Sequence, residues 1–383
     1  MKIGLICPYN IAIRGAVQEI VRDMRDGLIR NGHEVRIITP EPRGAEDFHE
    51  EHVIFIGNGG DFRSPLHTTA QFSASVDLSE IDEVLNREKF DVLHFHEPWV
   101  PVLSRQILSR SKAVNIATFH AKLPETMMSR TVAKVVTPYT KSALKYLHAL
   151  TAVSEPAAEY VSSLTDEPIT IIPNGIDLKR FKWVDRKPKP AGEPKTILYM
   201  GRIEQRKGLK YLLKAYDLLV QEQSDVHLVV AGDGSDREKM ETLVTTLELP
   251  NVTFLGLVSD EKKRELFQTA DLFCSPAVYG ESFGLVLLEA MASGLVTVAG
   301  DNSGYESVMK GMGTLSLVNP RDSAEMARRL GLLLNEPKLR ADWLTWAKSY
   351  VKQFDYPAII NRYEELYSYT LKHHRHHVHP YED

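Results

Sequence analysis

The feature that most constrains the fold is an alternation of short apolar strands and amphipathic helices, which occurs on both sides of a proline-rich segment. Residues 3–7 form an apolar run, and apolar residues then recur at helical spacing from Val17 to Leu28. A second strand pattern follows at 35–39, so the chain begins with a β-α-β unit, which requires parallel strands. Further strand patterns lie at 53–56, 91–95, 114–119, 149–153 and 169–172.

The proline-rich segment 187–194 has no periodicity and is typical of a linker, and the alternation resumes after it. We therefore predict an α/β protein with two doubly wound Rossmann-like domains, residues 1–185 and 195–355, which face each other across a ligand-binding cleft. The second series of strand patterns lies at 196–200, 226–231, 252–255, 271–275, 295–299 and 314–318. Its helical patterns lie at 207–222, 235–247, 260–269, 284–293, 322–334 and 338–353.

The composition excludes several classes of protein. The chain has 383 residues, 43% of them apolar and 25% charged, which is ordinary for a soluble protein with more than one core. Two cysteines, Cys7 and Cys274, cannot build a disulfide framework. The net charge of -5 argues against a nucleic-acid partner. Because no apolar run approaches the ~18 residues that span a bilayer, we expect a cytoplasmic or membrane-peripheral protein.

The net charge conceals a basic stretch between Trp99 and Leu150, which holds eight basic residues and one acid and so carries +7. Apolar residues are interleaved with the cations, a pattern that suits a reversible contact with an anionic membrane surface. A solvated helical face is the alternative. The residues expected at the membrane are Lys122, Arg130, Lys134, Lys141 and Lys145.

The segment 280–294 is the first of two stretches that carry chemistry. Gly284 permits a close approach of backbone or ligand, and Ser282 is placed to cap the helix that follows. The N-terminus of that helix suits phosphate or sugar oxygens. Glu281 and Glu289 are about two helical turns apart and are spaced to face one bound molecule. The alternative is an amphipathic helix with two glutamates in solvent.

The segment 201–209 follows an apolar strand and carries Arg202 and Lys207. An arginine fork and a lysine point charge together suit a diphosphate. Cations at the start of a helix are unfavourable for its dipole, which favours a bound anion over a plain surface helix.

These two segments together resemble the signature of family 4 glycosyltransferases, which have the GT-B fold. The N-terminal half is similar to bacterial phosphatidylinositol α-mannosyltransferases. The segments that carry this similarity are Cys7-Pro8-Tyr9, Gly15-Ala16-Val17-Gln18, His94-Phe95-His96-Glu97-Pro98 and Ala117-Thr118-Phe119-His120. The resemblance implies a retaining hexosyltransferase that uses a nucleotide sugar as co-substrate and has no tightly bound cofactor.

Substrates, location and domain packing follow from the same resemblance. It implies transfer of mannose from GDP-mannose to a membrane lipid such as phosphatidylinositol, on the inner face of the plasma membrane. The alternative is a UDP-sugar donor with diacylglycerol or a cell-envelope saccharide as acceptor. The first domain is expected on the acceptor and membrane side, with a C-terminal helix at 357–372 packed back on it. The second domain is expected to bind the nucleotide sugar.

The resemblance also assigns roles to residues. It makes His120, Glu281, Arg202 and Lys207 catalytic: His120 lies over the reacting sugar, Glu281 holds its hydroxyls, and the cations neutralise the leaving diphosphate. Tyr9 and Gln18 lie near the acceptor. No metal ligand and no protein general base are implied. The residues expected to bind the donor are Gly15, Ala16, Arg202, Lys207, Val258, Lys263, Glu281, Ser282, Phe283, Gly284, Leu285 and Glu289. Ala16 departs from the family, which has a second glycine there, so the approach of the phosphate depends on a negative φ at Ala16.

Three other functions compete with this prediction. His94, His96, Glu97 and His120 include side chains that suit zinc or iron. A dehydrogenase needs Gly-x-Gly-x-x-Gly after the first strand, but residues 7–17 contain only one glycine. A catalytically silent carbohydrate- or nucleotide-binding protein is a remote alternative. The histidine-rich tail, residues 373–379, is typical of a disordered terminus or a metal-binding tract.

Overall fold

The computed structural model describes residues 1–13, 15–42, 48, 50–63, 69–75, 77–100, 102–122, 127–186, 189–190 and 192–374. The chain forms two compact units, and each is described by itself. The first unit comprises Met1–Gly175 with Tyr356–Asp383, and the second comprises Ile176–Asp355. The end of the histidine-rich tail, residues 375–383, lies outside the described residues.

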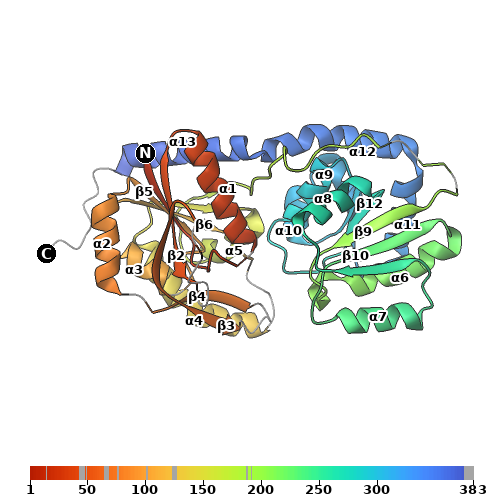
Figure 1. Ribbon diagram of the computed structural model, residues 1–383, viewed down its shortest axis with the longest axis horizontal. Coiled ribbons are helices and arrows are strands. Elements are labelled where there is room, and N and C mark those ends of the chain that lie inside the picture. The colour runs from red at the N-terminus through yellow and green to blue at the C-terminus, as the bar shows by residue number, and fades with distance from the viewer. Residues whose placement is uncertain are drawn as a thin grey trace. The chain divides into compact units, whose positions relative to one another are not determined.

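The first unit is built around an eight-stranded sheet in the order β4-β3-β2-β1-β5-β6-β7-β8 (Figure 1). All neighbouring strands are parallel except β3 and β4, which are antiparallel. The strands are β1 (Lys2–Ile6), β2 (Glu34–Glu41), β3 (Val53–Arg63), β4 (Thr69–Ser75), β5 (Val92–His96), β6 (Val114–Phe119), β7 (Ala149–Ala152) and β8 (Ile169–Ile171). The helices are α1 (Ala16–Arg30), α2 (Leu78–Glu88), α3 (Leu103–Leu108), α4 (Met127–Leu144), α5 (Glu155–Ser162) and α13 (Tyr356–His374).

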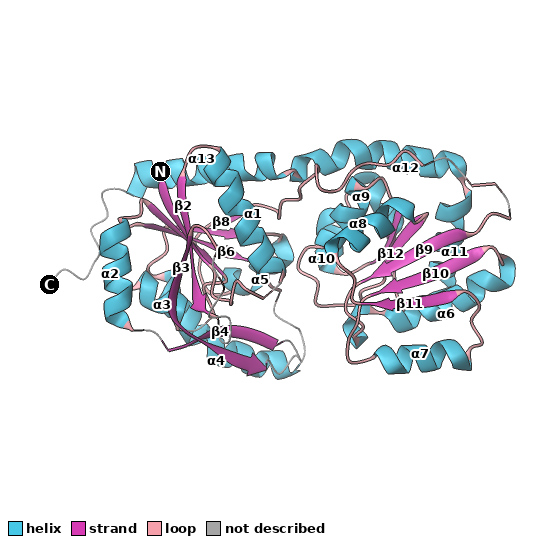
Figure 2. Ribbon diagram, viewed as in Figure 1, coloured by secondary structure: helices cyan, strands magenta, loops and turns pink. Residues whose placement is uncertain are grey.

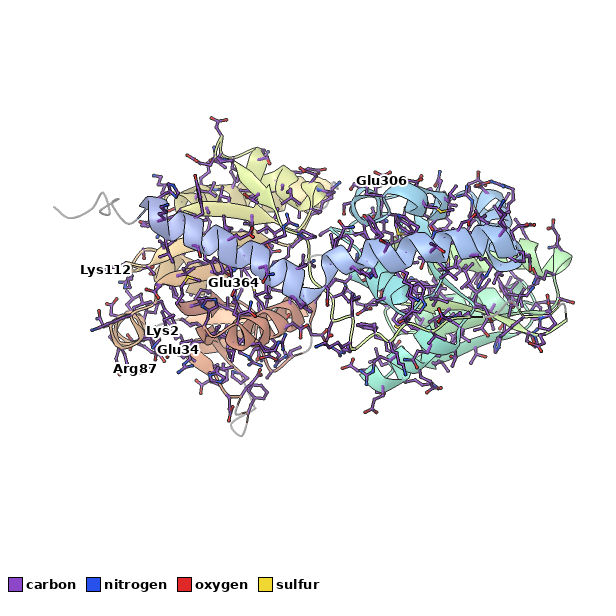
Figure 3. All side chains as sticks on the ribbon, turned by 90° about the horizontal axis from the view of Figure 1, so that it is seen from above. Lys2, Glu34, Arg87, Lys112, Glu306 and Glu364 are labelled. Carbon is purple, nitrogen blue, oxygen red and sulfur yellow. The ribbon has the colours of Figure 1, made fainter. Side chains whose placement is uncertain are left out.

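The C-terminal helix α13 packs against α1 in the first unit. Gly27 of α1 permits this packing, because a Cβ there would lie 2.7 Å from Ile360 Cγ1. Ile360 and Tyr367 of α13 belong to the same buried apolar cluster as the residues of β1. Glu364, which is labelled on this helix in Figure 3, lies 2.6 Å from His33 Nε2. Apolar packing and this polar pair therefore hold the last helix on the first unit.

The second unit has a six-stranded parallel sheet in the order β11-β10-β9-β12-β13-β14, with helices on both faces (Figure 2). The strands are β9 (Lys195–Met200), β10 (Val226–Ala231), β11 (Val252–Gly256), β12 (Leu272–Ser275), β13 (Thr297–Gly300) and β14 (Leu317–Val318). The helices are α6 (Leu209–Glu222), α7 (Arg237–Thr246), α8 (Asp260–Thr269), α9 (Leu285–Ala292), α10 (Ser303–Val308), α11 (Ser323–Asn335) and α12 (Pro337–Tyr350). Short 3₁₀ turns lie at Gln205–Lys207, Gly311–Ser316 and Val351–Phe354.

The boundary between the units differs from the expected end of the first domain at residue 185. Residues 176–186 belong to the second unit. Arg186 fixes this segment there, because its guanidinium donates to the Ala270 carbonyl at 2.9 Å and to the Ser293 carbonyl at 2.8 Å. Residues 187, 188 and 191 of the proline-rich segment lie outside the described residues, and the second unit begins before that segment, at Ile176.

Several elements differ from the sequence prediction. The strand expected at 314–318 is largely a 3₁₀ turn, and only β14 (Leu317–Val318) pairs with β13. The antiparallel strand β4 and the short helix α10 were not predicted. No helix among the described residues is both long enough and apolar enough to cross a membrane.

Candidate functional site of the second unit and the histidine cluster of the first

In the second unit, the order of the strands reverses between β9 and β12. The loop after β9, residues 201–208, carries both cations that were expected to bind a diphosphate, and the loop after β12, residues 276–284, carries Glu281. The carboxyl ends of adjacent parallel strands open at the same edge of a sheet. The topology therefore joins two motifs that are far apart in the sequence.

Glu281 forms two ion pairs through one carboxylate oxygen. Its Oε1 lies 2.8 Å from Lys207 Nζ and 2.8 Å from the NH1 group of Arg206. The side chains of Glu281 and Lys207 are only 12% and 18% exposed, so water screens this pair less than a surface pair. Arg206 was missed as a site residue, although it directly precedes Lys207 in the same motif.

Three cations, Arg202, Arg206 and Lys207, form a cluster with Glu204 and Glu281. The side chain of Arg202 is the most exposed of the three, at 48%, against 23% for Arg206 and 18% for Lys207. Glu204 Oε1 lies 3.3 Å from the NH2 group of Arg202 and 2.6 Å from Arg206 Nε. The carboxylate of Glu204 thus holds two guanidinium groups beside the Lys207–Glu281 pair. The cluster places three cations around two carboxylates, an arrangement that favours an added anion.

Gly208 allows the two loops to approach each other. Its φ is +73°, and it ends the 3₁₀ turn Gln205–Lys207 immediately before α6. A Cβ at this position would lie 2.0 Å from the carbonyl oxygen of Pro276. The Val278 amide donates to the Arg206 carbonyl at 2.8 Å and joins the loops directly. A glycine is therefore required here both by conformation and by space.

The helix α9 begins differently from the prediction. Gly284, with φ of +116°, occupies the cap position, and no side chain caps the helix. The expectation that Ser282 caps the helix is therefore wrong, because Ser282 lies two residues before the cap position. Leu285 is the first helical residue, and the ring of Phe283 is buried against Phe354 in an edge-on contact.

Glu289 lies on α9 and forms its own ion pair, with Lys263 Nζ of α8 at 2.6 Å. Glu281 lies before the helix, as the predicted helix at 284–293 implies, and pairs with other cations. That both glutamates face one bound molecule stays a prediction. Lys263 Nζ also lies 5.7 Å from the centre of the Phe181 ring. Val258, in the loop between β11 and α8, is partly exposed, and its neighbour Leu257 is 82% exposed.

In the first unit, the order of the strands reverses between β1 and β5, and the loop after β1 leads into α1. Gly15 precedes the helix in an extended conformation, and Ala16 is its first residue. The φ of Ala16 is negative, which is the conformation that an alanine in place of the second glycine was expected to need. Gln18 Nε2 donates to the Asn10 carbonyl at 3.4 Å, which brings it to the same loop as Tyr9. Burial raises the pKa of Tyr9 well above its usual range.

Three histidine rings stack at the carboxyl ends of β5 and β6. The ring centres of His94 and His96 are 4.4 Å apart, and those of His96 and His120 are 5.1 Å apart. His96 Nδ1 lies 2.9 Å from His120 Nε2. Burial lowers the pKa of His94 to about 3 and that of His120 to about 4, and it lowers the pKa of His96 as well, so all three rings are neutral at pH 7.

Glu97 joins this cluster through the backbone rather than as a metal ligand. Its Oε1 accepts the His120 amide N–H at 2.8 Å, and its Oε2 accepts the indole N–H of Trp99. Burial raises the pKa of Glu97 to about 7. Among the residues that the structure describes, no group of three or more His, Cys, Asp or Glu side chains is arranged to hold a metal ion.

The expected membrane-facing cations lie on and beside α4. Lys134, Lys141 and Lys145 are exposed. Lys122 lies 3.4 Å from Glu159 in an ion pair and is only 13% exposed, so it is less accessible than the other three. Arg130 belongs to α4, but its side chain lies outside the described residues.

Comparisons with known proteins agree with these features. Residues 17–180 match the model of Glycosyltransferase Family 4, and residues 181–349 match that of Glycosyl transferases group 1. The phosphatidyl-myo-inositol mannosyltransferase of Mycobacterium leprae is 31% identical over 374 residues, which cover 96% of each chain. The chain belongs to glycosyltransferase family 4. This glycosyltransferase is therefore a hexosyltransferase, not a dehydrogenase or a silent binding protein.

Further relatives of the glycosyltransferase are more distant. The sulfoquinovosyl transferase of Arabidopsis thaliana is 25% identical to this chain. The alignment covers 95% of this chain and 72% of the transferase. The solved structure of sucrose-phosphate synthase from Thermosynechococcus elongatus matches with a TM-score of 0.76 at 22% identity, over 97% of this chain and 99% of that one. The structure of Anabaena HepE in complex with UDP and glucose matches with a TM-score of 0.75 at 19% identity. The match covers 96% of this chain and 100% of that one. The fold of the glycosyltransferase is thus the expected GT-B fold.

Proposed function

We propose that this glycosyltransferase transfers mannose from GDP-mannose to phosphatidylinositol, with retention of anomeric configuration. The observation that carries the proposal is the similarity to phosphatidyl-myo-inositol mannosyltransferases along 96% of both chains. The Lys207–Glu281 cluster at the switch point of the second sheet supports a nucleotide-sugar site. The second candidate is transfer from a UDP-sugar to diacylglycerol or a cell-envelope saccharide, which the similarity to a sulfoquinovosyl transferase favours.

The ion pairs suggest how the donor is received. Lys207 and Arg202 neutralise the diphosphate, and Lys207 leaves Glu281 as it does so. The carboxylate of Glu281, which Arg206 still holds, then accepts hydroxyl groups of the sugar. Fixed cations beside the departing diphosphate stabilise the transition state electrostatically, which is usually the largest catalytic contribution. The leaving phosphate takes the proton of the acceptor hydroxyl, and His120 lies at the reacting sugar.

The other site residues contribute to donor and acceptor binding. Glu289, oriented by Lys263, contacts the ribose, and Val258 lies near the base. The amides of Phe283, Gly284 and Leu285 at the start of α9 bind sugar oxygens beside Ser282. Gly15 and Ala16 approach the donor phosphate through their amides, and Tyr9 and Gln18 bind the acceptor.

A transfer assay tests the function. Purified protein is incubated with radiolabelled GDP-mannose or with UDP-glucose, in the presence of phosphatidylinositol vesicles, and labelled lipid is counted. We expect labelled lipid from GDP-mannose, and a melting temperature raised by GDP more than by UDP or ADP. Product from the UDP-sugar, with stabilisation by UDP alone, would overturn the mannosyl proposal.

Two substitutions test the site within that assay. Glu281→Ala and Lys207→Ala should each abolish transfer while leaving the melting temperature near that of the wild type. The matched controls are Glu306→Ala and Lys210→Ala, which remove exposed side chains of the same unit and should leave the rate unchanged; Glu306 is labelled in Figure 3. Near-normal turnover of either site variant would refute the assignment.

We propose further that α4 and the residue after it meet the anionic inner face of the plasma membrane through Lys134, Lys141 and Lys145. At about 1 kcal/mol per cation near such a surface, replacing all three by glutamine should weaken vesicle binding by roughly 100-fold. Co-sedimentation with phosphatidylglycerol vesicles measures the effect, and binding should fall with added salt. Equal binding to neutral vesicles would contradict the proposal. The matched control replaces three exposed lysines of the second unit, Lys210, Lys310 and Lys352.

A further inference from the structure

The loop that carries Glu281, residues 276–284, lies against the segment that follows the next strand of the sheet. Strands β12 and β13 are parallel neighbours, so the segments after them open at the same edge. The segment after β13 is Asp301-Asn302-Ser303-Gly304-Tyr305, and it leads into α10. None of the predicted site residues lies in this segment, although it contacts the loop at three places.

Asn302 makes the first contact through both ends of its side-chain amide. Its Oδ1 accepts the Tyr305 amide at 3.0 Å and caps α10, and its Nδ2 donates to the Ala277 carbonyl at 2.9 Å. These partners fix the orientation of the amide, because a backbone N–H can only donate and a carbonyl can only accept. Asn302 is 8% exposed, so water does not readily replace either bond.

Gly304 makes the second contact, against the backbone of Glu281 itself. A Cβ on Gly304 would lie 2.2 Å from the Glu281 carbonyl oxygen and 3.0 Å from its Cβ. The φ of Gly304 lies outside the left-handed region, so its conformation suits any residue. The close approach to Glu281 alone therefore requires a glycine here.

Tyr305 makes the third contact, at the end of the loop. A Cβ on Gly284, the cap residue of α9, would lie 2.8 Å from Cδ1 of this ring. The Tyr305 hydroxyl is 2.7 Å from the Ser275 hydroxyl at the end of β12, and the whole ring is buried. Glu306, the next residue, is exposed (Figure 3). The loop is thus supported by the face of α10 that carries Gly304 and Tyr305.

We propose that Asn302 and Gly304 are positioning residues, which fix the backbone of Glu281 so that its carboxylate meets the donor sugar. The proposal rests on the role proposed for Glu281 in binding the sugar. Donor binding takes Lys207 away from Glu281 in that mechanism, so Arg206 and the backbone contacts then hold the carboxylate. Because other residues bind the nucleotide, loss of these contacts should slow sugar transfer and leave the affinity for GDP unchanged.

Gly304→Ala tests the close approach, with Gly331→Ala as its matched control. Both glycines lie in helices, where alanine is favoured, but a Cβ on Gly331 would make only an ordinary contact, 3.4 Å from Leu219 Cδ1. Gly304→Ala should lower kcat about 10- to 100-fold, because small displacements of groups at a reacting centre have effects of this size. The dissociation constant of GDP, measured by calorimetry, should change less than twofold. Gly331→Ala should change neither quantity, and an unchanged kcat in Gly304→Ala would overturn the proposal.

Asn302→Ser tests the hydrogen bond to the loop. Serine keeps a capping oxygen for α10 and removes the donor to Ala277, so kcat should fall about 10-fold with little change in GDP affinity. The control is Asp322→Ala, which removes the cap of α11, where the Asp322 carboxylate accepts the Glu325 amide at 2.9 Å. This control should lower the melting temperature and leave kcat unchanged. An equal loss of kcat in Asp322→Ala would show that stability, not position, is the cause.

Hydrogen exchange without substrate separates this proposal from the proposed function. Amides of the 276–284 loop should exchange about 10-fold faster in Gly304→Ala and Asn302→Ser than in the wild type, with no change in Gly331→Ala. Unchanged exchange in both site variants would refute the positioning role. Should the wild type transfer no sugar at all, the proposed function fails, while the exchange rates still decide whether Asn302 and Gly304 hold the loop.

Discussion

Replacing Gly208 by alanine should damage both stability and catalysis, and the chain contains a matched control. Gly208 and Gly192 both have left-handed φ angles, +73° and +85°. A Cβ on Gly192 would meet nothing within 4 Å, whereas a Cβ on Gly208 would lie 2.0 Å from the Pro276 carbonyl oxygen. The two substitutions therefore share the conformational cost and differ only in the steric one.

The magnitude follows from these two costs. An alanine in the left-handed region costs about 1–2 kcal/mol relative to glycine. Overpacking against a neighbour that must move adds about 1–3 kcal/mol. We expect Gly192→Ala to lower the free energy of unfolding by about 1 kcal/mol and Gly208→Ala to lower it by about 3 kcal/mol.

The same substitution should separate the loops that hold Lys207 and Glu281. The expected loss of kcat in Gly208→Ala is on the order of 100-fold, because a shift of about 1 Å at reacting groups has that effect. Guanidinium unfolding followed by circular dichroism measures the free energies, and the transfer assay measures the rates. Equal losses of stability in both variants, or an unchanged kcat in Gly208→Ala, would refute the reasoning.

Three further predictions concern other contacts. The pKa of His94 is lowered to about 3, against 6.5 in the unfolded chain, so the unfolded state binds its proton first and stability falls as the pH drops below 6.5. The difference in unfolding free energy between wild type and His94→Phe should shrink by about 2 kcal/mol between pH 7 and pH 5, and a constant difference would contradict the shift. Tyr367→Phe leaves Nδ1 of that buried ring without its hydrogen-bond partner and should cost about 1–3 kcal/mol of unfolding free energy by denaturant titration. Lys263→Met removes the partner of Glu289 and should raise the donor KM several-fold with little change in kcat, measured by initial rates.

Neighbouring residues supply the controls for the last two predictions. Tyr369→Phe, on the same helix α13 but 62% exposed, should leave stability within about 0.5 kcal/mol of the wild type. Lys262→Met, which disrupts an exposed pair with Glu265, should leave the donor KM unchanged. A loss in either control equal to that of the site variant would show that the assigned contact is not the cause.

Much of the fold follows from local pattern. Strand β10 and helix α8 begin and end at the predicted residues, 226–231 and 260–269. Their apolar spacing is regular, and Ser259 caps α8 by accepting the Lys262 amide. The predicted domain boundary was less accurate, because contacts of Arg186 with distant carbonyl groups decide to which unit its segment belongs.

The candidate site likewise combines residues that the sequence identified with contacts that it did not predict. Arg202, Lys207, Glu281 and Glu289 were recognised because each lies in a short motif next to a strand end. Their ion pairs were not predicted, because Lys207 with Glu281 and Lys263 with Glu289 come from segments that are far apart in the sequence.

Local sequence patterns predict two doubly wound domains, motif residues after their strands, and the signature of a glycosyltransferase. Periodicity, turn residues and motifs act over a few residues, so they can be read in order along the chain. The long-range contacts come from the folded chain: Arg206 joins Lys207 at Glu281, and Tyr367 of the last helix bonds His94 across 273 positions. Such contacts depend on strand order and on the close approach permitted by residues such as Gly27 and Gly208, which no local pattern encodes.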